Sequence, residues 1–178
     1  MSSEPLRVWR HPRPEGAAGL CVGAGCDLPL HWRRAKRLAR RIQQVARRER
    51  LPRRIWTSPL QRCADVGRWL RHWGWQHRID PALAELDFGR WDGLAWSAID
   101  KAQLDAWVAD FATHRPGGGE SLVELLDRAA GWRAEPGALV VGHGGWMLAR
   151  RWRLERGQAL PEAEQWPAPP RYGACWEL

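Results

Sequence analysis

Residues 138–145 read ALVVGHGG, and this stretch decides the fold that the sequence predicts. Four apolar residues in succession, 138–141, indicate a strand buried on both faces, which is typical of the centre of a parallel sheet. The glycines around His143 end this strand, and an apolar pattern with helical spacing resumes at residues 146–154. A buried strand that leads directly into a helix predicts an α/β architecture.

The rest of the chain repeats this alternation of strands and helices. We predict strands at residues 6–9, 54–57 and 173–178, and helices from about residue 31, from residue 58, and over residues 96–111 and 121–132. Ser58 is predicted to cap its helix, with Pro59 in the first helical position. The sequence therefore predicts one domain, residues 1–178, folded as a three-layer α/β sandwich with a mainly parallel central sheet flanked by helices.

The composition is that of a globular protein. The 178 residues are 44% hydrophobic and 27% charged, which is enough to build a core without disulfides or structural metals. The longest uncharged run, residues 136–149, is too short to span a bilayer, and no secretory signal is visible. The four cysteines lack zinc-ligand spacing, so we expect reduced thiols and a cytoplasmic protein; a redox pair of Cys21 and Cys26 is the weaker alternative.

The positive charge is concentrated in the first half of the chain. The net charge of +8 divides into +10 for residues 1–89 and −2 for residues 90–178, and most of the excess lies in residues 31–54. Apolar residues recur there at helical spacing, at Trp32, Ala35, Leu38, Ala39, Ile42, Val45 and Ala46. We interpret this stretch as a helix with a solvated basic face. Nucleic-acid contact is the less favoured alternative, because no nucleic-acid-binding motif accompanies the helix.

Charged and polar residues follow the predicted strands where each strand ends. Arg10 and His11 follow the first strand and His143 follows strand 138–141, while Arg62 lies in the helix after strand 54–57. Because the carboxyl ends of parallel strands line one crevice, these side chains are expected to converge. Two guanidinium groups beside helix N-termini form an anion site, for which phosphate is the best candidate.

An imidazole and a carboxyl group would give this anion site its chemistry. A neutral His facing phosphorus can act as a nucleophile, and Glu85, in the predicted loop 83–93, can cover the crevice and donate a proton. Each residue also has an ordinary interpretation: a structural His after a strand, one of many surface arginines, or a loop carboxylate. The spacing alone leaves both interpretations open.

Five motifs follow one another along nearly the whole chain. They are Arg10-His11, TSPLQR at residues 57–62, ELDFGRWDG at residues 85–93, GGES at residues 118–121 and VGHGG at residues 141–145. In this order they resemble the histidine phosphatase superfamily, also called phosphoglycerate-mutase-like. The resemblance implies an α/β phosphomonoesterase that works through a phosphohistidine and needs no metal or other cofactor.

The resemblance also implies a role for each site residue. His11 would attack phosphorus, while Arg10, Arg62 and His143 would hold the phosphoryl oxygens. Glu85 would protonate the leaving alcohol and then deprotonate water.

Two further residues are candidates for substrate binding. The backbone N–H of Gly144, together with that of Gly145, would add donors at a helix start. The family pattern Arg-His-Gly-x-Thr/Ser-x-x-Asn loses its Gly, hydroxyl and Asn in residues 12–17 of this chain. Arg13 is therefore a candidate replacement donor, with a solvent-facing position as the alternative.

One segment is similar to a particular branch of this family. GLCVG at residues 19–23 and DLPL at residues 27–30 are similar to stretches of the α-ribazole phosphatases of cobalamin synthesis. The implied partner is a small phosphorylated substrate, for which α-ribazole 5′-phosphate is the first candidate. From the composition and motifs we expect no membrane partner, and nucleic acid is the less favoured partner. The alternatives are a sugar phosphate, a nucleotide, a protein phosphohistidine, or an inactive phosphate- or nucleic-acid-binding relative; the oligomeric state stays open.

Overall fold

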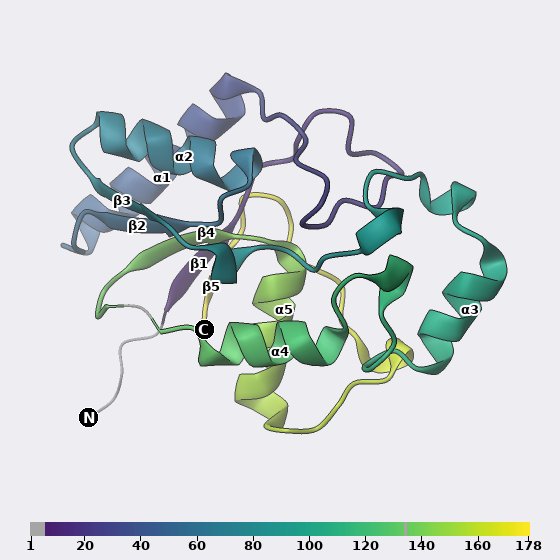
Figure 1. The fold of residues 1–178 in the computed structure, drawn as a ribbon. Helices are drawn as coiled ribbons and strands as arrows, with labels where there is room; N and C mark the ends of the chain where they lie inside the picture. The colour runs from purple at the N-terminus through teal and green to yellow at the C-terminus, as the bar shows by residue number, and fades with distance from the viewer. Residues whose placement is uncertain (1–5, 134) are drawn as a thin grey trace.

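A five-stranded sheet forms the middle of the structure, a computed structural model that describes residues 6–133 and 135–178 (Figure 1). The strands are β1 (Arg7–Arg10), β2 (Arg54–Thr57), β3 (Gln76–Ile79), β4 (Leu139–Gly142) and β5 (Cys175–Glu177). Their order is β3-β2-β4-β1-β5, in which only β5 runs antiparallel to its neighbour, β1. The strand predicted to be central is therefore the middle strand, and all of its residues are buried.

Helices cover both faces of this sheet. On one face lie α1 (Trp32–Arg48) and α2 (Gln61–His72), and on the other α4 (Leu122–Gly131) and α5 (Gly144–Arg156) (Figure 1). The fifth helix, α3 (Lys101–Ala109), lies to the side, beyond the sheet (Figure 1). The predicted three-layer α/β sandwich is confirmed. None of the helices among the described residues is long and apolar enough to cross a membrane.

Alternating side chains of the central strands divide the core in two. Trp9 and Val141 pack into the cluster under α1 and α2, whereas Val8 and Val140 pack into the cluster under α4 and α5. This division follows from strand geometry, because successive side chains point to opposite faces of a sheet. Burial on both faces thus explains the continuous apolar run of β4 and the two apolar residues in the middle of β1.

Two local features differ from the sequence-based expectation. Strand β3 was not predicted, because its sequence, Gln-His-Arg-Ile, is polar and mostly exposed at the sheet edge. The predicted helix at residues 96–111 is wrong in its first part: a short 3₁₀ turn, Trp96–Ala98, precedes α3. Asp100 starts α3 anew, since its side chain accepts hydrogen bonds from the backbone N–H groups of Ala102 and Gln103.

The start of α2 also differs from the prediction. The helix begins at Gln61, and Ser58 is not its N-cap. A carboxylate oxygen of Asp27, far away in the sequence, accepts the N–H of Gln61 at 2.8 Å and so caps the N-terminus of α2. Ser58 is fully buried, and its hydroxyl oxygen turns toward the end of β4 instead.

Candidate active site

The two candidate histidines meet where β1 and β4 end. These strands are parallel neighbours with Arg10 opposite Gly142, so the residues that follow them lie side by side. The backbone N–H of His11 donates to the carbonyl of Gly142 at 3.0 Å, and the rings of His11 and His143 are 5.0 Å apart between centroids. The predicted convergence of the two imidazoles at one sheet edge is therefore seen in the structure.

The surroundings of His11 keep its ring neutral with one nitrogen free. His11 is 5% exposed, and its Nδ1 lies 2.7 Å from the carbonyl oxygen of Pro12, an acceptor that fixes the proton on Nδ1. Burial lowers the pKa of His11 to about 3, with the positive charges of Arg62 and Arg10 adding to the effect. At neutral pH the Nε2 lone pair is thus available for attack.

His143 is fully buried between the strand end and α2. Its Nε2 lies 2.8 Å from Oγ of Ser58 and 3.3 Å from Sγ of Cys63. Burial holds the pKa of His143 well below its ordinary value, and the charge of Arg62 acts in the same direction. Its other nitrogen, Nδ1, is buried without a hydrogen-bond partner among the described residues.

Arg62 is held in place by the loop before α1. The side chain is fully buried on the first turn of α2, and its terminal nitrogens donate to the carbonyls of Cys26 and Gly23, both at 2.8 Å. The carboxylate of Asp27 lies 4.0 Å away. These contacts leave Nε of Arg62 buried and without a partner within the described ranges.

Arg10 is oriented by a segment near the carboxyl end of the chain. One of its terminal nitrogens donates to the carbonyl of Pro170 at 2.6 Å, and its guanidinium carbon lies 4.0 Å from the ring centre of Tyr172. Tyr172 is 42% exposed and is also 5.5 Å from the ring of His11. The sequence analysis missed Tyr172, the chain's one tyrosine, because no periodicity or motif marks its segment.

Three buried nitrogens in this cluster have no partner in the described part of the chain: Nε of Arg10, Nε of Arg62 and Nδ1 of His143. Buried polar groups are almost always hydrogen-bonded, since leaving one unpaired costs about 1–3 kcal/mol. Two of the three belong to cations, and all three lie around His11. An oxyanion with several acceptor oxygens would satisfy them together.

Glu85 reaches the same region from the loop after β3. Its carboxylate accepts the backbone N–H of Gly145 at 3.1 Å, at the start of α5. Arg128 fixes this loop: it donates to the carbonyls of Ala82 and Ala84 and forms an ion pair with Glu120 at 2.8 Å. The sequence did not single out Arg128, because nothing distinguishes it locally from other helical arginines.

The glycines after His143 differ from each other in their contacts. A Cβ on Gly144 would lie 3.2 Å from Nε of Arg10 and 2.9 Å from Cβ of Pro169, so a side chain does not fit there. The N–H of Gly145 is taken by Glu85 and is not free for a substrate. The N–H of Gly145 therefore does not have the role expected of it, whereas the N–H of Gly144 stays a predicted donor.

Arg13 does not join the cluster. Its side chain is exposed, and its backbone carbonyl accepts a hydrogen bond from a terminal nitrogen of Arg34 at 2.8 Å. The buried prolines on either side, Pro12 and Pro14, hold the backbone so that Arg13 points outward. Of the two interpretations of Arg13, the structure favours the solvent-facing one.

The cysteines carry free thiols. Cys21 and Cys63 are buried, and none of the four is in a disulfide. Burial raises the pKa of the Cys21 thiol to about 12, and that of Cys26 is raised as well. Protonated thiols are poor nucleophiles, which argues against a redox role for this pair.

Comparison with known proteins places this geometry in a family. A model of the histidine phosphatase superfamily (branch 1) matches residues 6–171. No curated protein matches the chain. The solved structure of a mycobacterial glucosyl-3-phosphoglycerate phosphatase is 27% identical with a TM-score of 0.72, covering 97% of this chain and 88% of that one.

Two further solved structures are similar. The mycobacterial phosphatase in complex with VO3 is 26% identical with a TM-score of 0.73, covering 97% of this chain and 91% of that one. A putative α-ribazole-5′-P phosphatase from Escherichia coli is 23% identical with a TM-score of 0.67, covering 84% and 79%, and it shows likeness of fold alone. The family match over residues 6–171 and the similar phosphatase structures together show that the chain belongs to the histidine phosphatase superfamily and is a phosphoric monoester hydrolase.

Proposed function

We propose that this enzyme hydrolyses small phosphomonoesters through a phosphohistidine on His11, without a metal or other cofactor. The observation that carries the proposal is a set of three buried nitrogens around a neutral imidazole, none of which has a partner among the residues that the structure describes. Arg10, Arg62 and His143 bind the phosphoryl oxygens and stabilise the charge that they carry in the transition state. The two guanidinium groups supply the positive charge that a metal ion supplies in other phosphatases.

In the first step, Nε2 of His11 attacks phosphorus in line with the ester oxygen. A nitrogen–phosphorus bond forms as the phosphorus–oxygen bond breaks, and the protonated carboxyl of Glu85 gives its proton to the leaving alcohol. The carboxylate of Glu85 accepts the N–H of Gly145 at the start of α5, two residues after His143, and Arg128 holds its loop. The products of this step are the free alcohol and an enzyme phosphorylated on His11.

In the second step, water replaces the imidazole on phosphorus. The carboxylate of Glu85 takes a proton from the water, whose oxygen attacks phosphorus as the nitrogen–phosphorus bond breaks. Orthophosphate leaves, and both His11 and Glu85 return to their starting forms. The N–H of Gly144 is the further donor that we assign to substrate binding.

Ser58 has a positioning role in this proposal. Its oxygen accepts the N–H of Leu60 at 3.1 Å, so its hydroxyl proton is free to go to Nε2 of His143. The proton of the neutral His143 then lies on Nδ1, the nitrogen that has no hydrogen-bond partner in the described part of the protein. A donor at that position suits an anion, whereas a lone pair would repel it.

α-Ribazole 5′-phosphate remains the first substrate to test. The segments that suggested it, residues 19–23 and 27–30, contribute Gly23 and Asp27 to the surroundings of Arg62 and α2. The similarity of these two segments to the α-ribazole phosphatases thus has a partly structural cause. It does not identify the substrate by itself. A phosphorylated sugar derivative is the second candidate, because the mycobacterial glucosyl-3-phosphoglycerate phosphatase is the more similar in sequence of the two.

The decisive experiment replaces the nucleophile. Removing a covalent nucleophile leaves only binding and electrostatics, so a folded His11→Ala protein should lose at least about a thousandfold in kcat. The wild type, quenched during turnover of a ³²P-labelled ester, should carry acid-labile, base-stable label on His11, and EDTA should not inhibit it. Normal turnover by His11→Ala would contradict the proposal. The same assay, run with α-ribazole 5′-phosphate, glucosyl-3-phosphoglycerate, a nucleotide and a phosphohistidine peptide, ranks the substrates by kcat/KM.

A further inference from the structure

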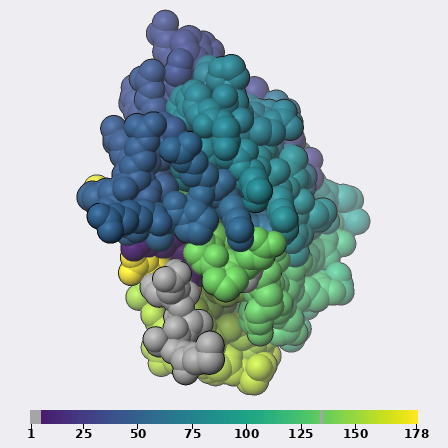
Figure 2. Space-filling model, turned by 90° about the vertical axis from the view of Figure 1, so that its left-hand side faces the viewer, coloured from purple at the N-terminus to yellow at the C-terminus, as the bar shows by residue number. Residues whose placement is uncertain are grey.

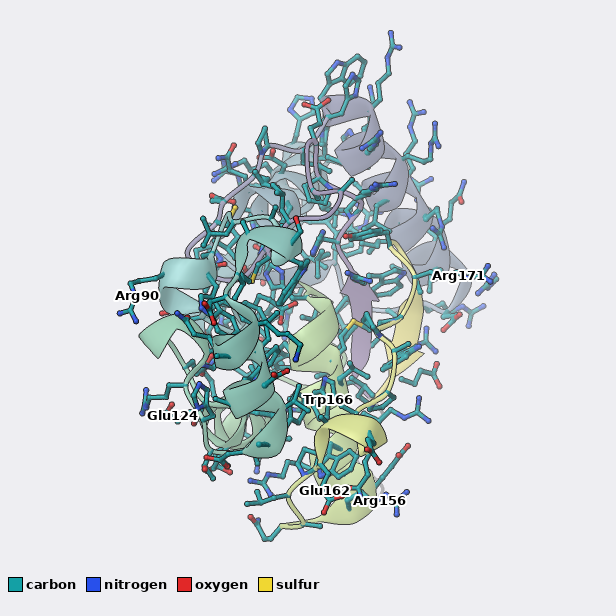
Figure 3. All side chains as sticks on the ribbon, turned by 90° about the vertical axis from the view of Figure 1, so that its right-hand side faces the viewer. Arg90, Glu124, Arg156, Glu162, Trp166 and Arg171 are labelled. Carbon is teal, nitrogen blue, oxygen red and sulfur yellow. The ribbon has the colours of Figure 1, made fainter. Side chains whose placement is uncertain are left out.

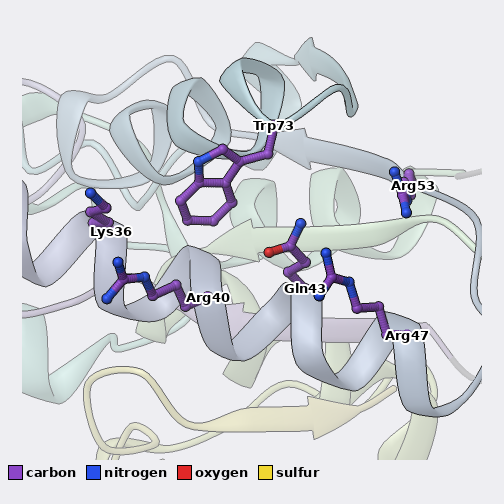
Figure 4. Close-up of a pocket in the computed structure, with 6 residues that line it drawn as sticks. All are labelled: Lys36, Arg40, Gln43, Arg47, Arg53 and Trp73. Atoms are coloured by element: carbon purple, nitrogen blue, oxygen red, sulfur yellow. The ribbon is translucent and has the colours of Figure 1, made fainter.

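A basic groove runs along α1 on the outer side of the molecule. It is lined by Lys36, Arg40, Gln43, Arg47, Arg53 and Trp73 and has a volume of about 440 Å³ (Figure 4). A second hollow, of about 500 Å³, continues it and shares Lys36 and Arg40. Figure 2 shows this side of the molecule, where the blue segment formed by α1, α2 and their connections occupies much of the upper surface. Neither hollow has a carboxylate in its lining.

The cations of this groove are not balanced by acidic side chains. Residues 31–54 hold 11 of the chain's 28 basic residues but one carboxylate, Glu49, which pairs with Arg7 and Arg48. Within the described ranges, Lys36, Arg40 and Arg47 take part in no ion pair. An Arg-rich composition accounts for how many arginines the chain has, but not for their concentration along one helix.

The spacing places three cations on one side of α1. Lys36, Arg40 and Arg47 are four and seven residues apart, close to one and two helical turns, or roughly 6 and 10 Å along the axis. Arg53 extends the row beyond the end of the helix. A row of this kind suits a ligand that carries several negative charges in succession.

An indole lies among these cations. Trp73, at the end of α2, reaches over α1 between Lys36 and Arg40 on one side and Gln43 and Arg47 on the other (Figure 4). Its ring centre is 5.9 Å from that of Trp69, and the Lys36 ammonium lies 4.7 Å from the centre of the Trp69 ring. The groove therefore combines positive charge with aromatic surface on which a flat ring can stack.

One end of the groove lies away from the catalytic cluster. The catalytic residues follow the carboxyl ends of β1 and β4, whereas Arg53 directly precedes β2 and Trp73 follows the last turn of α2. In a parallel α/β sheet these two sets of positions lie at opposite ends of the strands. The part of the groove that Arg53 and Trp73 line is thus separate from the phosphate site.

We propose that the basic groove binds single-stranded nucleic acid. Successive phosphates pair with Lys36, Arg40 and Arg47, and an unpaired base stacks on Trp73. The indole selects single strands, because a base within a duplex has no free face to offer. The sequence favoured a solvated basic face, but the structure gathers those cations into a groove beside an indole. This inference is independent of the proposed phosphatase activity.

The test measures binding of a fluorescein-labelled 20-nucleotide oligo(dT) to the full chain by fluorescence polarisation over a range of salt. The variant Arg40→Glu/Arg47→Glu should bind at least tenfold more weakly. The loss of two phosphate contacts should also reduce the slope of log affinity against log salt concentration by about 1.4, because each contact contributes about 0.7 to that slope. The matched control is Arg90→Glu/Arg156→Glu, with the same charge change on exposed residues of another side (Figure 3). It should change affinity less than threefold.

Trp73→Ala tests the stacking separately from the charge. It should weaken oligo(dT) binding about tenfold and leave the salt slope unchanged, because stacking releases no counterions. Both groove variants should keep wild-type turnover of a nitrophenyl phosphate, which shows that they fold. Equal weakening by the groove and control pairs would overturn the proposal. It would also be overturned if the protein bound duplex DNA as tightly as single strands and Trp73→Ala did not change the affinity. A third contrary result would be binding of phosphatidylglycerol vesicles that depends on the groove, without binding of the oligonucleotide.

Discussion

The imidazoles of His11 and His143 lie side by side but have different hydrogen-bond partners, and these partners suit them to different roles. His11 donates a hydrogen bond from Nδ1 to the carbonyl of Pro12, which leaves the Nε2 lone pair for the nucleophilic role that we propose. His143 has Ser58 at Nε2, and its Nδ1 has no partner among residues 6–133 and 135–178, which fits the proposed donation to a bound oxygen. In this proposal one neighbour of each ring, the Pro12 carbonyl for His11 and the Ser58 hydroxyl for His143, determines which ring nitrogen carries the proton.

The role of Ser58 can be separated from simple packing. Ser58→Ala removes the hydroxyl that donates to Nε2 of His143 and allows the other tautomer, with a lone pair facing phosphate. We expect kcat to fall about ten- to a hundredfold and vanadate to bind more weakly. In ¹⁵N spectra of the His143 ring, the protonated nitrogen should change from Nδ1 to Nε2.

Cys63 provides the matched control for Ser58. Its sulfur also lies near Nε2 of His143, at 3.3 Å, but its thiol is directed at the carbonyl of Gly142 at 3.5 Å. Cys63→Ala should therefore lower kcat less than about threefold and leave the His143 tautomer unchanged. Equal effects of the two substitutions on kcat and on the ¹⁵N spectrum would show that the serine does not set the tautomer.

The role of Glu85 as a proton donor depends on the leaving group. Glu85→Gln keeps the size and removes the proton, so the phosphorylation step should slow by roughly a hundredfold with an alkyl ester. A nitrophenyl ester needs no proton to leave, so the same step should be much less affected. A burst of nitrophenolate followed by slow turnover in stopped-flow traces would show impaired hydrolysis of the phosphohistidine. Equal slowing of the first step for both esters would exclude Glu85 as the acid.

At the scale of elements, loops rather than helices position Arg62. The loop before α1 supplies the carbonyls of Gly23 and Cys26 that hold its guanidinium. That loop is itself held by Asp92, whose carboxylate accepts the N–H groups of Gly23 at 2.5 Å and Gly25 at 2.8 Å. Asp92 thus acts on the phosphate site through two intermediates, the loop before α1 and Arg62.

Removing this contact should affect both stability and phosphate binding. Asp92→Ala leaves N–H groups of the loop unpaired, and we expect the free energy of unfolding to fall by about 2–4 kcal/mol. Because Arg62 loses its fixed support, KM should rise several-fold and vanadate should bind more weakly. Urea unfolding and inhibition assays measure the two effects.

The exposed Asp105 on α3 supplies the control for Asp92. It forms an exposed ion pair with Lys101 on the same helix, so Asp105→Ala should change the free energy of unfolding by less than about 0.5 kcal/mol and leave KM unchanged. An Asp92→Ala protein that is less stable but has an unaltered KM would show that the contact supports the fold and not the site.

For the whole molecule, the buried histidines predict acid sensitivity. Burial and nearby arginines lower the pKa of His11 to about 3 and that of His143 well below its ordinary value, whereas both return to about 6.5 on unfolding. As the pH falls below 6.5 the unfolded chain therefore takes up protons that the folded chain does not. The stability is fully present above that pH and is lost as the pH falls, by about 1.4 kcal/mol per pH unit for each imidazole.

Urea unfolding between pH 7.5 and 4.5, in buffers free of phosphate, measures this loss. The His11→Ala variant should have a slope of unfolding free energy against pH that is smaller by about 1.4 kcal/mol per pH unit in the acidic range. An identical slope in wild type and variant would show that His11 does not titrate differently in the folded and unfolded chains.

The sequence by itself determined the architecture and the convergence of the main site residues. Apolar runs and helical spacing identified the sheet and its covering helices, and strand ends identified Arg10, His11 and His143. This works because burial imposes a regular pattern, and because parallel strands bring their carboxyl ends to one edge. The single domain spanning residues 1–178 stays a prediction.

The hydrogen-bond and packing partners of these residues are visible only in the tertiary structure. Asp27 rather than Ser58 caps α2, Ser58 contacts His143, and Arg13 points outward. Tyr172 packs on Arg10 from 162 residues away. Such contacts join segments that are distant in the chain, and no local propensity records them, because a hydroxyl or carboxylate satisfies a nearby or a remote donor equally well.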